Sequence, residues 1–176
     1  LITGGPGTGK TTILKGILSL LGQMQLRCVL AAPTGRAAKR LTEVTERDAS
    51  TIHRLLETTI DPHTGKMFFL KDENNPLDVD AVIVDEMSMV DVLLLHSLLQ
   101  AVPQGARLIL VGDPDQLPPV GPGFPFSDML RSGKLPSIRL TEIFRQAQES
   151  LIVMNAHRVN LGQMPELRNV KKDFFF

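Results

Sequence analysis

The residues with the clearest potential for chemistry lie near the start of the chain. Gly4-Gly5-Pro6-Gly7-Thr8-Gly9-Lys10-Thr11 fits the pattern G-x-x-x-x-G-K-[ST]. The glycines allow backbone N–H groups to turn toward phosphate oxygens, and a helix that begins near Lys10 points its positive end at the same anion. Lys10 is expected to reach the outer phosphates of a nucleoside triphosphate, and the Thr11 hydroxyl to bind Mg²⁺. The predicted nucleotide contacts are Gly5, Pro6, Gly7, Thr8, Gly9, Lys10, Thr11 and Thr12.

Two carboxylates, Asp85 and Glu86, close the apolar run that begins at Ala81. We expect Asp85 to hold Mg²⁺, directly or through water, and Glu86 to orient and deprotonate an attacking water. Such a pair is common on its own, and it indicates a site for Mg²⁺ and the attacking water only in combination with the phosphate loop. An acid directly after the metal ligand suits hydrolysis better than transfer to a second substrate, which argues against a small-molecule kinase.

A third polar segment, the loop Gly112–Gly123, is rich in proline and glycine and contains Gln116. A neutral amide can donate and accept hydrogen bonds at once. Gln116 can therefore detect whether a γ-phosphate is present and pass this on to the adjoining loop. The alternative is a plain turn, since Asp-Pro and Pro-Pro are turn formers.

Apolar runs alternate with helical patterns along the chain, which predicts an α/β fold of the P-loop NTPase type with a parallel sheet covered by helices on both faces. The expected strands are Leu1–Thr3, Arg27–Ala32, Ala81–Asp85, Arg107–Val111 and Ser137–Leu140. The expected helices are Lys10–Leu21, Thr34–Thr45, a short one capped by Ser50 or Thr51 and running through Glu57, Asp91–Ala101, and one around Gln146–Asn160. Asp61–Asp80 is expected to be a loop or a small hairpin. Ligands of such sheets sit beyond the carboxyl ends of the strands, so the three polar segments should converge there.

The overall composition sets wider limits on the protein. The 176 residues include 19 basic and 19 acidic ones, so net charge neither favours nor excludes a nucleic-acid partner. Cys28 is the only cysteine, so an intramolecular disulfide is excluded. No apolar run reaches the ~20 residues that span a bilayer. We expect a cytoplasmic protein without a membrane partner, and a first strand whose beginning is missing.

Six stretches of the chain carry a further signal together: Gly112–Val120, Asp85–Ser88, Ala32–Ala38, Thr51–Leu56, Leu140–Gln146 and Asn155–Arg158. These stretches resemble superfamily 1 DNA helicases, and in particular their RecD-type branch, which includes the alpha subunit of exodeoxyribonuclease V. The resemblance implies a RecA-like motor domain that hydrolyses ATP and moves 5′ to 3′ along single-stranded DNA. It places this domain in residues 1–145, and a helix and segment leading toward a missing second motor domain in residues 146–176.

The resemblance also implies roles for single residues. Gln116 would contact the γ-phosphate, and Arg145 would be a further γ-phosphate contact that stabilises charge in the transition state. The implied DNA contacts are Pro33, Thr34, Arg36, Thr51, His53 and Arg54. Alternatives stay open for several side chains: Arg145 as a surface residue and His53 as a helix-packing residue. Residues Arg27–Arg54 carry more positive than negative charge, which would suit DNA, but Arg36, Lys39 and Arg40 can equally form a solvated helix face.

One apolar segment departs from the family pattern. Phe124-Pro125-Phe126 follows the Gln116 loop where a more polar helix entry is expected. These residues would be part of the core or of an apolar patch covered by a missing domain.

Three functions compete at this stage. The first is an ATP-driven DNA helicase motor whose partners are single-stranded DNA, a second motor domain and, in some assemblies, other subunits of a helicase–nuclease complex. The second is an AAA-type ATPase that remodels proteins, which shares the phosphate loop and the acidic pair but not Gly112–Val120. The third is a DNA-binding P-loop scaffold without activity, against which the intact Lys10, Asp85 and Glu86 argue.

Overall fold

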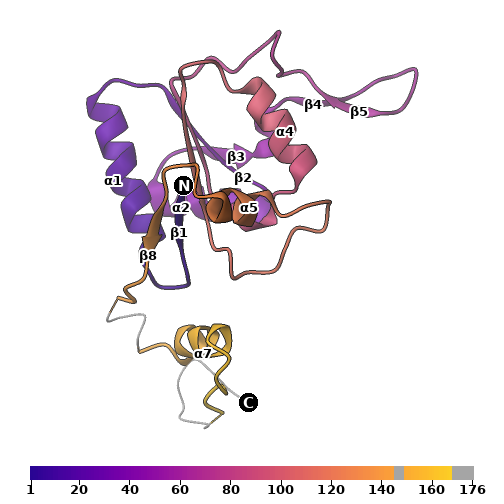
Figure 1. The fold of residues 1–176 in the computed structure, drawn as a ribbon. Helices are drawn as coiled ribbons and strands as arrows, with labels where there is room; N and C mark the ends of the chain where they lie inside the picture. The colour runs from indigo at the N-terminus through magenta and orange to yellow at the C-terminus, as the bar shows by residue number, and fades with distance from the viewer. Residues whose placement is uncertain (145–148, 168–176) are drawn as a thin grey trace.

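A six-stranded parallel sheet forms the centre of the computed structural model, which describes residues 1–144 and 149–167 (Figure 1). The strand order is β3-β2-β6-β7-β1-β8, and every neighbouring pair is parallel. The strands are β1 (Ile2–Gly4), β2 (Cys28–Ala32), β3 (Ala49–Thr51), β6 (Ala81–Val84), β7 (Arg107–Gly112) and β8 (Ile138–Leu140). The predicted fold class is therefore confirmed.

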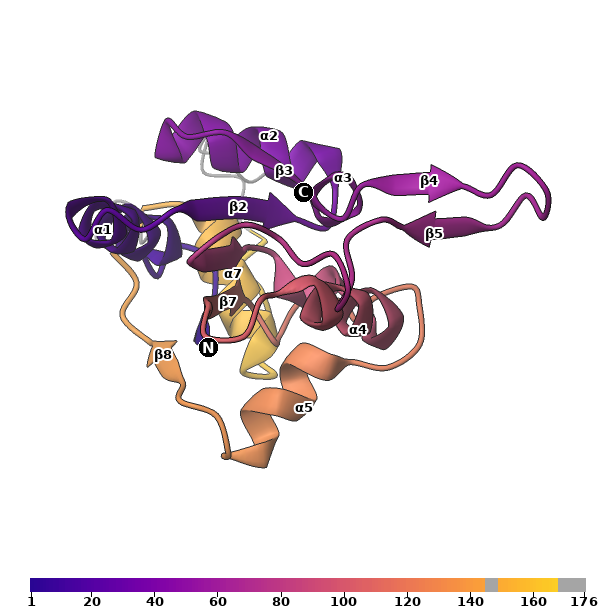
Figure 2. The same cartoon turned by 90° about the horizontal axis from the view of Figure 1, so that it is seen from above.

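Helices cover both faces of the sheet, as Figure 2 shows from above. On one face, α1 (Lys10–Gln23) and α2 (Gly35–Thr45) bury Leu14, Leu18 and Leu41 against the sheet. On the other face lie α3 (Ile52–Leu55), α4 (Val92–Ala101) and α5 (Pro125–Ser132). All four residues of β6 are buried, which explains why this strand reads as a continuous apolar run rather than an alternating one.

Two strand regions differ from the sequence-based expectation. The edge strand β3 was not predicted, because three short residues of mixed polarity, Ala49-Ser50-Thr51, carry no periodic signal. Its pairing with β2, Leu30 to Ala49 and Ala32 to Thr51, supplies what the local sequence lacks. The small antiparallel hairpin β4 (Thr58–Ile60) and β5 (Met67–Phe69) begins before the predicted Asp61–Asp80 region and projects beyond the sheet in Figure 2.

The segment Phe124-Pro125-Phe126 enters the core. Pro125 is the first residue of α5, a position that needs no backbone N–H. A helix entry was expected here, but a more polar one, and the bounds of the helix were not predicted. Phe126 is completely buried and lies so close to Gly112 that a Cβ there would come within 2.9 Å of its ring. Of the two alternatives, core residue or covered patch, the structure supports the core.

The described part of the last predicted helix is α7 (Leu151–Asn160). The Ser150 side chain caps α7 by accepting a hydrogen bond from the Val153 N–H at 3.2 Å. The expected helical start at Gln146 lies outside the described residues. The proposed boundary between residues 145 and 146 lies outside the described residues and stays a prediction. In the parts of the chain that the structure describes, no helix is long and apolar enough to cross a membrane.

Candidate nucleotide-binding site

The phosphate loop connects β1 to α1, as the motif requires. Gly7 and Gly9 adopt φ values of 74° and 86°, a left-handed region that side-chain-bearing residues rarely enter. The Thr8 hydroxyl donates to the Gly5 carbonyl at 2.9 Å. The Lys10 ammonium donates to the carbonyls of Gly4 at 2.6 Å and Gly5 at 3.0 Å, so the lysine side chain folds back onto the start of the loop.

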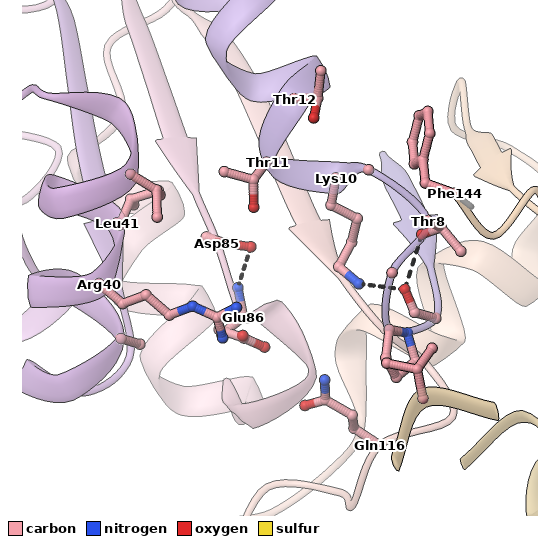
Figure 3. Close-up of a pocket in the computed structure, with 17 residues that line it drawn as sticks. Thr8, Lys10, Thr11, Thr12, Arg40, Leu41, Asp85, Glu86, Gln116 and Phe144 are labelled. Carbon is pink, nitrogen blue, oxygen red and sulfur yellow. Dashed lines mark hydrogen bonds between the residues drawn. The ribbon is translucent and has the colours of Figure 1, made fainter. Parts of the chain in front are cut away.

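A cavity of about 730 Å³ opens beside this loop (Figure 3). Its lining combines residues from the phosphate loop, α1, α2, the segment directly after β6, the loop after β7 and two later segments. They are Gly5, Pro6, Gly7, Thr8, Gly9, Lys10, Thr11, Thr12, Ala37, Arg40, Leu41, Val44, Asp85, Glu86, Gln116, Phe144 and Val153. The structure thus brings together around one cavity the residues predicted for the nucleotide, the metal and the water, with Arg145 as the exception. Arg145 lies outside the described residues, and its predicted role stays a prediction.

The acidic pair, Asp85 and Glu86, follows the carboxyl end of β6 and lines this cavity. Asp85 Oδ1 accepts the Glu86 N–H at 2.9 Å. Glu86 has φ 55° and ψ 40°, an uncommon backbone conformation for glutamate of the kind that clusters at functional sites. Burial raises the pKa of Asp85 above its ordinary value, opposed by the Glu86 N–H and by the charges of Lys10 and Arg40. Burial and then the neighbouring Asp85 raise the pKa of Glu86.

The donor set here fits Mg²⁺. Thr11 and Asp85 offer a hydroxyl and a carboxylate, and their side chains lie next to each other in Figure 3. Mg²⁺ in phosphate-transfer sites is held by one or two such oxygens, together with waters and substrate phosphates. Within residues 1–144 and 149–167, no group of three or more His, Cys, Asp or Glu side chains could hold a metal without such help.

Gln116 is linked directly to the acidic strand end. The buried Ser88 hydroxyl donates to Gln116 Oε1 at 3.3 Å, and the Gln116 N–H donates to the Asp113 carbonyl at 3.2 Å. Ser88 comes from the short 3₁₀ helix η1 (Met87–Met89) that directly follows Glu86. The sequence alone did not identify Ser88 as a site residue, because its partner is 28 positions away.

The predicted DNA contacts gather at the other flank of the same sheet edge. Pro33 and Thr34 follow β2 and Thr51 ends β3, and the register pairs Ala32 with Thr51. The remaining candidates, Arg36, His53 and Arg54, are exposed. Two threonines also have a structural role, because Thr34 Oγ1 accepts from the Ala37 N–H and Thr51 Oγ1 from the Arg54 N–H at the starts of α2 and α3. Of the two expected caps, Ser50 and Thr51, the structure shows Thr51, and the helix ends at Leu55 rather than at Glu57.

Residues near the end of the chain contact the phosphate loop, which sequence reasoning missed. The Phe144 N–H donates to the Gly7 carbonyl at 3.1 Å, and its ring occupies the space that a Cβ on Gly9 would need. From α7, His157 Nε2 lies 3.0 Å from the Pro6 carbonyl oxygen. Both residues lie in stretches that resemble the helicase family, Leu140–Gln146 and Asn155–Arg158, but no local pattern indicated their contact with the loop, since His157 is 151 positions from its partner.

A parallel α/β sheet with this loop, acidic pair and polar amide defines a P-loop nucleoside triphosphatase of the RecA-like type. A family model described as an AAA domain matches residues 1–122. The chain belongs to this family.

Comparison with individual proteins narrows the class. The chain is 46% identical over 165 residues to the ATP-dependent RecD2 DNA helicase of Deinococcus radiodurans, a match that covers 94% of this chain and 22% of that protein. It is 40% identical over 153 residues to the RecBCD enzyme subunit RecD of Mycobacterium tuberculosis, covering 74% of this chain and 26% of the relative. The crystal structure of Bacteroides Pif1 bound to single-stranded DNA matches 93% of this chain and 42% of that one, with a TM-score of 0.59 and 25% identity.

These similarities distinguish between the functions that the sequence left open. The resemblance to RecD-type helicases is confirmed, and the relatives support a helicase motor domain rather than a protein-remodelling ATPase. The chain spans about a quarter of the length of these two curated relatives.

Proposed function

We propose that this chain is the first motor domain of an ATP-dependent DNA helicase, which binds ATP with Mg²⁺ and uses hydrolysis to move along single-stranded DNA. The observation that carries the proposal is the single cavity that joins a complete phosphate loop, an acidic pair and Gln116. The names of the relatives, an ATP-dependent DNA helicase and a Pif1 bound to single-stranded DNA, support the choice of nucleotide and of track.

The phosphate loop binds and orients the triphosphate in this proposal. The backbone N–H groups of Gly7 and Gly9 and the N-terminus of α1 face the phosphates. Lys10 exchanges its carbonyl partners, Gly4 and Gly5, for phosphate oxygens. Thr11 and Asp85 hold Mg²⁺, which when bound neutralises charge on the transferred phosphoryl group.

Glu86 acts on the attacking water. Its carboxylate accepts a proton from that water while the water oxygen bonds to the γ-phosphorus. The bond between the γ-phosphorus and the β–γ bridging oxygen breaks at the same time, and ADP leaves with that oxygen. The hydrogen bond between Ser88 and Gln116 connects this strand end to the loop after β7, so a γ-phosphate contact at Gln116 can alter both segments at once. Arg145 adds a further cation to the γ-phosphate by resemblance only.

Single-stranded DNA lies at the other flank of the sheet edge in this proposal, against the ends of β2 and β3. Arg36, Thr51 and His53 can contact backbone phosphates there, and such contacts position a strand without reading its sequence. A second motor domain of the same polypeptide would form the other wall of the nucleotide cleft. Association with other subunits of a helicase–nuclease complex completes the proposal and is supported by the name of one relative, RecBCD enzyme subunit RecD. Movement 5′ to 3′ is carried over from the family resemblance of the sequence motifs, and a cytoplasmic location is part of the same proposal.

The first test measures phosphate release by the full-length polypeptide that carries this chain, with and without single-stranded DNA. We expect strong stimulation by DNA and loss of at least ~100-fold in Lys10→Ala, the range for removing one electrostatic contact from a transition state. Ser19→Ala, an exposed change on the same helix, serves as the control. Hydrolysis that ignores DNA would contradict the motor, and full activity in Lys10→Ala would contradict the site.

A further inference from the structure

One cation in the cavity has no role in the mechanism above. Arg40 lies on α2, and the cavity-lining residues of that helix are Ala37, Arg40, Leu41 and Val44. Their spacing of three, one and three positions puts them on a single helical face. Lys39 lies off this face, and its ammonium is within 4.0 Å of Glu43 Oε1 on the exposed side of the helix. The helix thus separates two adjacent cations, with Arg40 at the cavity and Lys39 in solvent.

Arg40 faces the acidic pair from the side opposite Lys10. Figure 3 shows Arg40 reaching from α2 toward Glu86, while Lys10 approaches from α1. The charges of both residues favour the ionised forms of Asp85 and Glu86. The terminal phosphate of a bound triphosphate, together with its Mg²⁺, would occupy the space between these two cations and above the two acids.

The guanidinium of Arg40 also has free hydrogen-bonding capacity. Four other arginines form ion pairs with carboxylates: Arg27 with Asp78, Arg131 with Asp128, Arg139 with Asp115 and Arg158 with Glu166. Among the described arginines without such a pair, Arg36, Arg40, Arg47, Arg54 and Arg107, it is Arg40 that lines the cavity. Arg40 has no hydrogen bond or ion pair within 4.0 Å to any residue that the structure describes. A planar fork of N–H donors without a protein partner, at the wall of an anion site, is suited to two oxygens of one phosphate.

We propose that Arg40 is a second cation for the terminal phosphate, contacting γ-phosphate oxygens from α2 and stabilising the charge that develops as the phosphoryl group is transferred. This inference rests on the proposed function, because it needs a triphosphate in the cavity. In this proposal α2 has two functions. The residues at its N-terminal end, Thr34 and Arg36, are candidate DNA contacts, and Arg40 on its cavity face contacts the nucleotide.

The test compares affinities for ADP and for a non-hydrolysable ATP analogue, with Mg²⁺, in the full-length polypeptide. Arg40→Ala is expected to weaken binding of the analogue by ~10- to 100-fold, the range for one charge-assisted hydrogen-bonding contact, and to change ADP binding less than about twofold. Arg40→Lys should recover part of the loss, since an ammonium keeps the charge but not the fork. The turnover number should fall in the same order, Arg40→Ala below Arg40→Lys.

Lys39→Ala is the matched control, because it removes the neighbouring cation from the solvent side of the same helix. It should bind both nucleotides like the unaltered protein, and its melting temperature should match that of Arg40→Ala. Equal losses for ADP and the analogue would reveal a structural role and overturn the proposal. So would an Arg40→Ala protein that behaves like Lys39→Ala, or one that loses only DNA binding.

Failure of the underlying function has a separate signature. If Lys10→Ala binds the analogue as well as the unaltered protein, the phosphate site itself is wrong, and both proposals fall. If Lys10→Ala loses binding while Arg40→Ala does not, only the role of Arg40 is wrong.

Discussion

Two separate constraints require glycine at position 9, the backbone conformation and the space available for a side chain. Its φ of 86° belongs to the left-handed region, and the ring of Phe144 fills the position of a side chain. Both constraints act on the residue immediately before Lys10. A change at Gly9 therefore alters the loop geometry and the packing of Phe144 together.

We expect Gly9→Ala to destabilise the folded chain by about 1–3 kcal/mol, the cost of a non-glycine residue in this backbone region, and to weaken triphosphate binding. Gly16→Ala is the control, since Gly16 is an exposed helical residue with open space around a Cβ. That change should instead stabilise the chain by about 0.5–1 kcal/mol. Urea unfolding of the two variants measures the difference, and destabilisation by both alike would contradict the argument.

The acidic pair illustrates a conflict between function and stability. Because burial raises the pKa of Asp85 and Glu86 in the folded chain, the folded state binds protons more tightly than the unfolded state. The contribution of the pair to stability is therefore greatest below the unfolded-state pKa values. It declines as pH rises through the interval up to the folded-state values.

The double variant Asp85→Asn, Glu86→Gln is accordingly expected to melt higher than the unaltered protein at pH 7, without nucleotide or Mg²⁺. A gain of ~1 kcal/mol would raise the melting temperature by about 2–4 °C in a chain of this size. The difference should shrink toward pH 4, and Asp48→Asn, an exposed change, should show none of it. A variant that melts lower at pH 7 would show that the acids stabilise the empty site.

At the scale of elements, two residues that cap helices are also candidate contacts for DNA. Thr34 and Thr51 were predicted as DNA contacts, and both accept backbone N–H groups at helix starts. A loss of DNA binding in an alanine variant therefore has two explanations, lost contact or lost cap. The serine variant separates them because it keeps the hydroxyl that caps the helix.

We expect Thr34→Ala to lower the free energy of unfolding by about 1 kcal/mol, as measured by urea titration. Thr34→Ser should stay close to the unaltered protein, because serine is an equally good cap. If Thr34→Ala keeps full stability, the hydrogen bond to Ala37 contributes nothing measurable and the threonine is free to serve DNA alone.

The elements also show what the sequence could and could not predict. Long apolar runs such as Ala81–Val84 and the spaced residues of the phosphate loop carry their own signal, so the sheet, its class and the converging motifs were predictable. The strand β3 and the helix α5 depend on partners elsewhere, Leu30–Ala32 and the core around Phe126. The contacts of Ser88 with Gln116 and of His157 with Pro6 join residues 28 and 151 positions apart, and only the folded chain brings them together.

For the whole molecule, protection of the backbone should decrease from the central strands outward. β6 is entirely buried and is paired on both sides, whereas the hairpin β4–β5 pairs only with itself and has exposed Ile60 and Met67. Local opening is easiest where few apolar contacts are lost.

Hydrogen exchange followed by mass spectrometry should therefore find β6 and β7 slowest and the hairpin fastest. Addition of ATP analogue and Mg²⁺ should slow exchange in Gly5–Thr12 and leave the hairpin unchanged. A hairpin as slow as β6 would mean that it is covered by another part of the polypeptide.

The position of β7 in the sheet has a consequence for which nucleotides the site can accept. β7 lies between β1, which leads into the phosphate loop, and β6, which ends at Asp85. Two strand intervals of ~4.8 Å set these strand ends about 10 Å apart. This distance is set by the backbone hydrogen bonds between the strands and does not depend on the side chains. Exchange of residues at the cavity rim could therefore alter the preference for base or sugar, whereas a change in the distance between the phosphate loop and Asp85 would require a rearrangement of the sheet.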